Sequence, residues 1–126
     1  MNVYETKLAA LDDGTLDPAS FSHRDHVGVA IATLQQGDFY EALGRMSRGL
    51  QRLTAAAGVP EKFNATVTFA FLSTIAEIEP KPGQDIDGLI DAHPEILRPK
   101  ALQALYSQDR MQSDIARKLP VLPLAS

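Results

Sequence analysis

The chain contains no cysteine, and this absence removes several classes of chemistry. Disulfide bonds, thiolate metal ligands and cysteine nucleophiles are excluded outright. The absence also fits a reducing cytoplasm, which is the compartment we expect for this protein. A length of 126 residues fits one domain, and folding at this size buries roughly two-thirds of the surface of the unfolded chain.

Long apolar runs and concentrated positive charge are also missing. The longest apolar run covers residues 27–32, whereas a membrane span needs roughly 18 residues or more. The start, MNVYETKLAALDDG, lacks a basic n-region and a long apolar h-region, so we expect no signal peptide. The formal net charge is −4, and binding to nucleic acid needs a concentrated basic surface. We therefore expect neither a membrane nor a nucleic acid as partner.

Common catalytic motifs are absent as well. No G-x-S-x-G nucleophile elbow occurs in the sequence, and no glycine-rich phosphate-binding loop occurs either. Whether the protein is an enzyme stays open at this point, because no reaction follows from the residues that are present.

Apolar residues recur at helical spacing almost throughout, which predicts an all-α protein. Four helices are expected in a core bundle that covers about residues 1–78. Their expected ranges are 3–11, 22–36, 39–57 and 63–78. The fourth is apolar around most of its circumference, which predicts that it is the buried central helix.

Glycine inside these helices has a cost, and we expect packing to offset it. Gly28, Gly44 and Gly49 lie within the expected helices, where each costs about 1 kcal/mol relative to alanine. Close backbone approach between neighbouring helices is the expected reason for all three glycines.

Residues 79–83, Glu-Pro-Lys-Pro-Gly, form the strongest break in the pattern. The part beyond it is too short to build a core easily, so we expect short helices within residues 84–119 to pack on the first bundle. Their expected ranges are 85–92, from Pro94 or Pro99 to Tyr106, and 107–118. The sequence thus predicts one all-α domain over residues 1–126, a bundle of five to seven helices with an extended, proline-containing C-terminal tail.

Two of the three histidines, His23 and His26, lie three residues apart in the stretch SFSHRDHVGVA. Ser22 is expected to cap the helix that begins here, with Asp25 as its capping-box partner. Residues i and i+3 share a helix face, with Cβ atoms roughly 5–6 Å apart, so both imidazoles can reach one ion. The positive end of the helix favours the neutral ring that a metal ion requires.

Spacing alone leaves two interpretations of this HxxH pair open. As metal ligands, two histidines are an incomplete set, because zinc, iron and copper sites usually have a third protein ligand. In the other interpretation, the pair caps, packs and hydrogen-bonds near the start of the helix. His93, which precedes Pro94, either caps the following helix or reaches back to the pair as a third ligand.

Five blocks of sequence resemble a family of small, uncharacterised bacterial helical proteins, and together they extend over most of the chain. The blocks are HRDHVGVA (23–30), RLTAAAGVPEKF (52–63), NATVTFAFL (64–72), HPEIL (93–97) and ALYSQDRMQSDIARK (104–118). The closing block is fairly specific. The resemblance implies no particular reaction, because the family has no secure activity.

The resemblance does imply a site. Relatives pair the two helix-start histidines with a Tyr-His-Glu-Thr segment at the next buried helix, and three histidines with a carboxylate would form a divalent-metal centre. This chain has Asn64 and Ala65 in place of that histidine and glutamate. Asparagine is a poor, uncharged ligand for a soft or borderline metal, and alanine offers none. Asn64 is also a natural N-cap for the helix that follows it.

Two residues of the closing block are further candidates for the same pocket. Tyr106 and Arg110 either line that pocket or act locally, the tyrosine as a half-buried anchor and the arginine as the partner of a carboxylate. The candidate ligand-binding set is therefore His23, His26, Asn64, Tyr106 and Arg110, and the two histidines are the candidate metal ligands.

Two hypotheses for function follow from these residues. In the first, the protein binds a small molecule or a divalent metal ion at His23 and His26, at a site weakened by Asn64 and Ala65. In the second, it is a non-catalytic interaction or structural protein that has lost the ligand set and forms a homodimer. The apolar edge expected to be covered in that case comprises Met111, Ile115, Leu119, Val121, Leu122 and Leu124. The alternative, which the sequence favours, is that this edge packs on the chain's own bundle.

Overall fold

The computed structural model describes residues 1–98 and 100–124, and this part of the chain is helical with no strand. The all-α bundle predicted from the apolar spacing is confirmed. The α-helices are α1 (Val3–Asp13), α2 (His23–Gln36), α3 (Phe39–Ala56), α4 (Ala65–Ala76), α5 (Ile86–Ala92), α6 (Lys100–Leu105), α7 (Gln108–Met111) and α8 (Asp114–Lys118). Three short 3-10 helices join them: η1 (Pro18–Ser20), η2 (Pro60–Lys62) and η3 (Pro94–Leu97).

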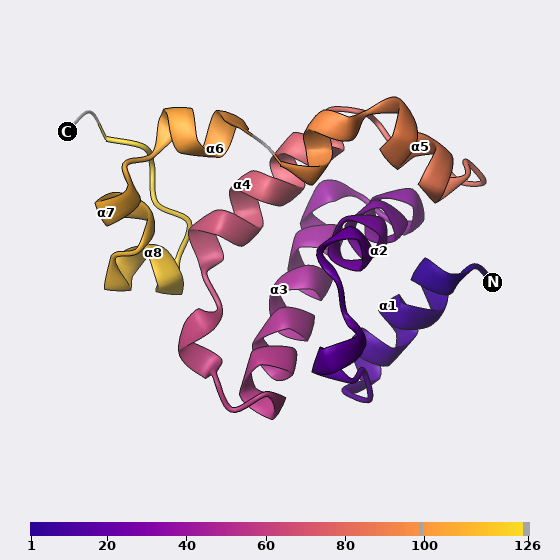
Figure 1. Cartoon of the computed structure of the whole chain (residues 1–126), viewed down its shortest axis with the longest axis horizontal. Coiled ribbons are helices and arrows are strands. Elements are labelled where there is room, and N and C mark those ends of the chain that lie inside the picture. Colours follow the sequence, from indigo (N-terminus) through magenta and orange to yellow (C-terminus); the bar gives the residue numbers. More distant parts are fainter. Residues whose placement is uncertain (99, 125–126) are drawn as a thin grey trace.

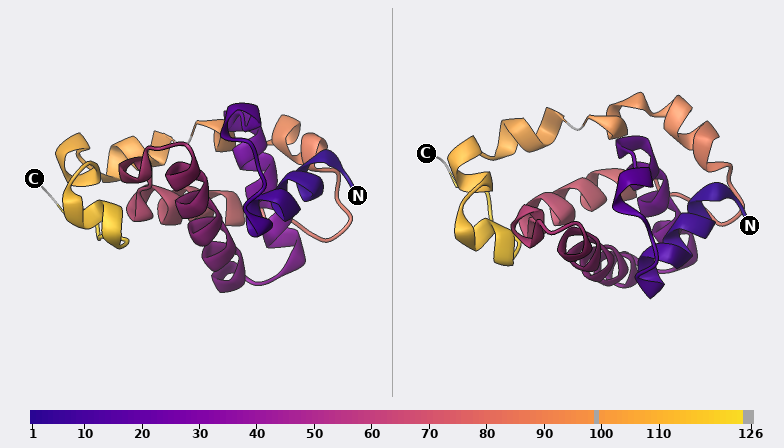
Figure 2. Two further views of the ribbon diagram at one scale, coloured as in Figure 1. Left: turned by 90° about the horizontal axis from the view of Figure 1, so that it is seen from below. Right: turned by 60° about the horizontal axis from the view of Figure 1, so that its bottom comes forward.

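The molecule is elongated, and the two ends of the chain lie at opposite ends of its long axis (Figure 1). The N-terminus, α1 and α5 form one end, while α6, α7, α8 and the tail form the other. Helix α4 extends from the bundle towards that second end, and both further views show the same separation (Figure 2). Within the described ranges, no helix combines the length and the apolar character needed to cross a bilayer.

Helix α2 is the centre of the bundle. Every residue from Val27 to Thr33 is buried, and α1, α3, α4 and α5 all pack against this helix. The prediction that the fourth helix is the central one is wrong. Four residues of α4 are buried and the rest are half-buried. Its apolar circumference is instead shared between the bundle and the C-terminal residues.

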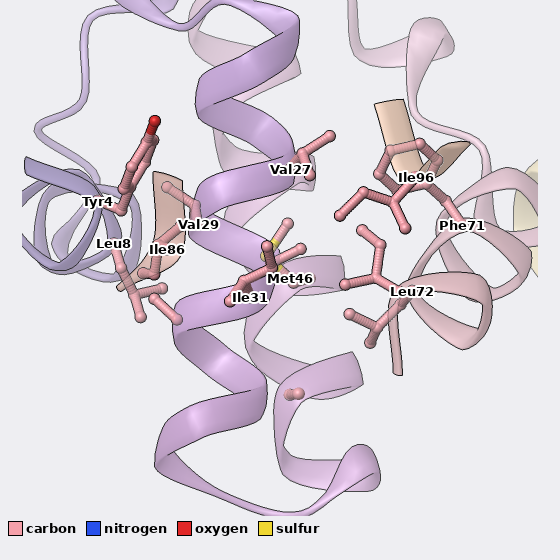
Figure 3. Packing of buried hydrophobic residues seen from close by; sticks show 14 of the residues in the cluster. Tyr4, Leu8, Val27, Val29, Ile31, Met46, Phe71, Leu72, Ile86 and Ile96 are labelled. Carbon is pink, nitrogen blue, oxygen red and sulfur yellow. The ribbon is translucent and has the colours of Figure 1, made fainter. Parts of the chain in front are cut away.

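The main core forms on both sides of α2 (Figure 3). Tyr4 and Leu8 from α1 approach one side of the helix, and Phe71 and Leu72 from α4 approach the other. Ile96 of η3 joins the α4 side, so the turn after α5 closes the core. This placement sets the start of α2, with its two histidines, directly against α4.

Side-chain caps define where the main helices begin. Ser22 and Asp25 form a complete capping box at α2, and Asp38 with Glu41 forms another at α3, as the sequence predicts. Asn64 caps α4 through a hydrogen bond from the Val67 amide to its side-chain oxygen, at 3.0 Å. Because this cap fixes the first turn, α4 begins one residue after Asn64 and not at Phe63 as expected.

The C-terminal segment, defined here as residues 100–124, packs mainly against α4. The single closing helix expected over residues 107–118 is wrong, because the chain forms two short helices there. The Ser113 hydroxyl donates to the Arg110 carbonyl at 2.7 Å and accepts from the Ala116 amide, which ends α7 and starts α8. The other expected helix begins at Lys100 after the 3-10 turn at Pro94, while Pro99 lies outside the described residues.

Candidate functional site

The two histidines at the start of α2 lie against the same aromatic ring. The ring centroids of His23 and Phe71 are 5.8 Å apart, in an edge-on arrangement. The His26 ring lies 5.5 Å from Phe71 and 5.6 Å from Phe21. Phe71 therefore brings together the two imidazoles that the i, i+3 spacing places on one face.

His23 uses one ring nitrogen within the protein. Its Nε2 is hydrogen-bonded to the carbonyl oxygen of Leu97, at the end of η3. A carbonyl can only accept, so Nε2 carries the proton and donates. In the neutral ring Nδ1 then holds the lone pair, and only this atom of His23 remains to bind a ligand.

His26 is half-buried between two phenylalanine rings and is neutral at pH 7. Burial, with a smaller contribution from the charge of His23, lowers the pKa of His26 to about 4. Neither of its ring nitrogens makes a hydrogen bond to another described residue. The imidazole is thus held in the form that a metal ion or a hydrogen-bonding ligand requires.

Nearby carboxylates do not complete a metal site around this pair. Asp25 belongs to the capping box, and its Oδ2 lies 2.6 Å from the amine of Lys7 on α1. Throughout residues 1–98 and 100–124, no three histidine, aspartate or glutamate side chains cluster closely enough to hold a metal ion. His93 lies at the end of α5, where its Nδ1 is 3.3 Å from Glu95.

Asn64 contacts the C-terminal segment. Its side-chain nitrogen donates to the Met111 carbonyl at 2.7 Å while its oxygen caps α4. Phe71 is seven residues further along α4, which corresponds to roughly 10 Å of helix rise. The structure thus brings the two histidines together and places Asn64 about two turns away, on a separate contact.

Tyr106 and Arg110 hold the C-terminal tail. The buried Tyr106 hydroxyl donates to the Val121 carbonyl at 2.8 Å. Arg110 donates to the Leu122 carbonyl from Nε and Nη2, at 3.4 and 3.3 Å. The polar atoms of these two candidate residues fix the tail in its extended course, and Ser107 caps α7 beside them.

Thr66 is a structural residue that the sequence interpretation missed. Its fully buried hydroxyl is within 3.0 Å of the Ala116 and Leu119 carbonyls, and it accepts from the Val121 amide at 3.0 Å. One side chain of α4 thereby holds both α8 and the tail. The available signal was a hydroxyl residue in a mainly apolar helix, since a buried hydroxyl needs partners, but Thr68, Ser73 and Thr74 of α4 give the same signal.

Comparisons of the chain with protein-family models, with curated proteins and with solved structures find no match. The resemblance carried by the five sequence blocks therefore remains a prediction.

Proposed function

We propose that this chain is a non-catalytic interaction protein and that its C-terminal segment contacts a protein partner. The observation that carries the proposal is a set of large apolar side chains exposed on this short segment, which we call the apolar end surface. Leu122 is 76% exposed and Leu105 is 58% exposed. The set comprises Leu105, Ile115, Leu119, Leu122 and Leu124. Leu105 lines one groove together with Leu122 and another together with Leu124, and adjoining exposed apolar groups are typical of an interaction site.

The shape of this region supports the proposal. A groove of about 320 Å³ lies between α4, α6 and the tail. Its apolar lining includes Phe69 and Ala70 from α4, Leu102 and Leu105 from α6, and Leu122 from the tail. A concave apolar surface of this kind suits the protruding side chains of a protein partner.

The bonds of the other candidate residues also support a structural and interaction role. Asn64, Tyr106 and Arg110 use their polar atoms to hold the C-terminal segment in place. Part of the apolar edge expected from the sequence packs inward, because Val121 is buried and Met111 is half-buried. The anchored residues fix the backbone, and the exposed leucines remain available for a partner.

Site-specific photocrosslinking in the cells that naturally make the protein tests this proposal. Replacing Leu122 with p-benzoylphenylalanine should give a discrete crosslinked protein adduct on illumination, because the side chain at this position faces outward next to the groove. The same replacement at Arg48, an exposed position on α3, is the matched control and should give none. If position 122 gives no adduct, or if both positions give the same adducts, the C-terminal segment is not an interaction surface.

A second function, binding of a divalent metal ion or a small ligand at His23 and His26, is favoured by a separate observation. The His26 ring is neutral and makes no hydrogen bond to the described residues, although it is half-buried. With Nδ1 of His23, it offers two imidazole donors for a borderline ion such as Zn²⁺, Ni²⁺ or Cu²⁺. Water or a small molecule would fill the remaining coordination positions.

Calorimetric titration of the tag-free protein with Zn²⁺ tests this second function. Wild type and the control His93→Ala, which removes a histidine of the α5 turn, should bind with the same affinity. The double variant His23→Ala/His26→Ala should lose binding at least tenfold, because both donors are gone. Equal heats for all three proteins, or weak binding that disappears only with His93→Ala, would rule out a metal site at the α2 start.

A further inference from the structure

Charge is distributed unevenly along the chain. Residues 1–99 contain eight basic and fourteen acidic side chains, whereas the C-terminal segment, residues 100–124, contains four basic and two acidic ones. Because the C-terminal segment forms one end of the long axis (Figure 1), this asymmetry in sequence becomes an asymmetry in space. The apolar end surface therefore lies on the positive end of an acidic protein.

Arg110, Arg117 and Lys118 form no ion pair with a carboxylate among the side chains that the structure describes. Every ion pair between described side chains lies within residues 1–97. Arg110 and Arg117 donate to backbone carbonyls, of Leu122 and Glu61 respectively. Lys118 is exposed. A partner with negative charge would therefore gain interactions that the chain itself does not make.

The opposite end of the same molecule has the complementary character. Asp87 and Asp91 are exposed on α5, where both pair with Arg24, and the exposed Asp85 caps this helix. Figures 1 and 2 place α5 beside the N-terminus. Tyr4 of α1 reaches Asp87 with a 2.5 Å hydrogen bond, so the two elements are in contact. Met1 and Val3 are exposed large apolar residues, and they stand at the start of the same α1. This end thus combines negative charge with a small apolar area.

We propose that the partner is a second copy of this chain, bound antiparallel so that the C-terminal segment of each copy lies on the α1–α5 end of the other. The inference rests on the proposed function, because it requires the C-terminal segment to be an interaction surface. A two-fold axis between antiparallel copies forms both contacts at once. Pairing of the two C-terminal segments with each other would oppose like charges, which favours the antiparallel arrangement.

Sedimentation equilibrium of the full chain gives the first test. Wild type should be a dimer at about 0.05 M salt, and its dissociation constant should rise roughly tenfold or more near 1 M salt, where charges are screened within a few ångströms. Leu122→Glu should also weaken the dimer, because it places a charge in the apolar contact. A monomer at all concentrations and salt levels would overturn the proposal.

A charge exchange tests the antiparallel geometry. Arg117→Glu/Lys118→Glu makes both ends of the chain acidic, and Glu5→Lys/Asp91→Lys makes both ends basic. Each variant alone should be monomeric, and their mixture should form a heterodimer, because both complementary contacts are restored. Circular dichroism checks that each variant keeps its helices. If both double variants still form dimers on their own, the proposed antiparallel arrangement is wrong.

A lipid surface or a different protein bound at the apolar end surface would give results that differ from those of a second copy. Binding of monomeric wild type to vesicles rich in phosphatidylglycerol would replace the second copy by an anionic lipid surface. Crosslinks from position 122 to a different protein, with a monomeric chain, would overturn the self-association and leave the proposed function standing. Crosslinks from position 122 to the chain itself support both, and the lack of any crosslink there removes both.

Discussion

Gly28→Ala should lower the free energy of unfolding by about 3 kcal/mol, the upper range for overpacking a well-packed core. Gly28 lies inside α2, directly under the ring of Tyr4. A Cβ atom at this position would lie 2.8 Å from Tyr4 Cγ and nearer still to Cδ1 and Cε1. The ring cannot easily move away, because it is 5% exposed and its hydroxyl donates to Asp87 at 2.5 Å.

Gly44→Ala is the matched control, and it should change stability in the opposite direction. Gly44 also lies inside a helix, α3, but nothing stands within 4 Å of the Cβ that alanine would add. The substitution should therefore raise the free energy of unfolding by about 0.5–1 kcal/mol, the helix-propensity difference between the two residues. Urea denaturation at constant m-value measures both changes. Destabilisation of equal size in the two variants would show that α1 does not press on α2 at Gly28.

These glycines show how far sequence reasoning reaches. It predicted close backbone approach between helices at all three helix-interior glycines. At two of them the structure instead packs a side chain against the glycine: Tyr4 on Gly28, and Leu11 on Gly49, where an added Cβ would lie 2.5 Å from Leu11 Cγ. At Gly44 the prediction is wrong. A glycine in a helix is a local feature, whereas the presence of a neighbouring helix over it depends on the tertiary arrangement.

Helix starts could be predicted from the sequence because they depend on nearby residues. Burial could not, because it depends on the tertiary arrangement. The caps at Ser22, Asp38 and Asn64 are formed by side chains bonding to amides three residues away, so the sequence contains all the information they require. The central position of α2 depends on which helices surround it. The break at Ser113 is intermediate, since the cap is local but competes with a helix that the apolar spacing also permits.

The candidate site likewise combines one feature that depends on nearby residues with others that depend on distant ones. The i, i+3 spacing correctly places both imidazoles on one face, where they meet Phe71. The partners that decide what each residue does come from distant parts of the chain: Leu97 for His23, and Met111 for Asn64. Contacts over such separations in sequence leave no pattern near either residue, so spacing could not indicate them.

Acid should destabilise the protein through His26 before most carboxylates are protonated. The pKa of His26 in the folded protein is about 4, below its ordinary value of 6.5, because burial disfavours the charged ring. Between these two pH values the unfolded chain binds more protons than the folded one, so the free energy of unfolding falls as pH falls from 6.5 towards 4. The full effect of this shift is roughly 3 kcal/mol, and above pH 6.5 the contribution to stability is complete.

His26→Phe isolates this effect, because a third aromatic ring between Phe21 and Phe71 keeps an apolar group at this position and cannot titrate. Urea denaturation of both proteins at intervals from pH 7.5 to pH 4 should give curves that separate as pH falls, with wild type losing roughly 3 kcal/mol more than the variant. Carboxylates that titrate in this range affect both proteins equally and cancel in the difference. Parallel curves would mean that the imidazole is protonated in the folded protein at mildly acidic pH. A ring that can take up a proton there must be open to water, and the packing of the α2 start on Phe71 would then be looser than the ring distances indicate.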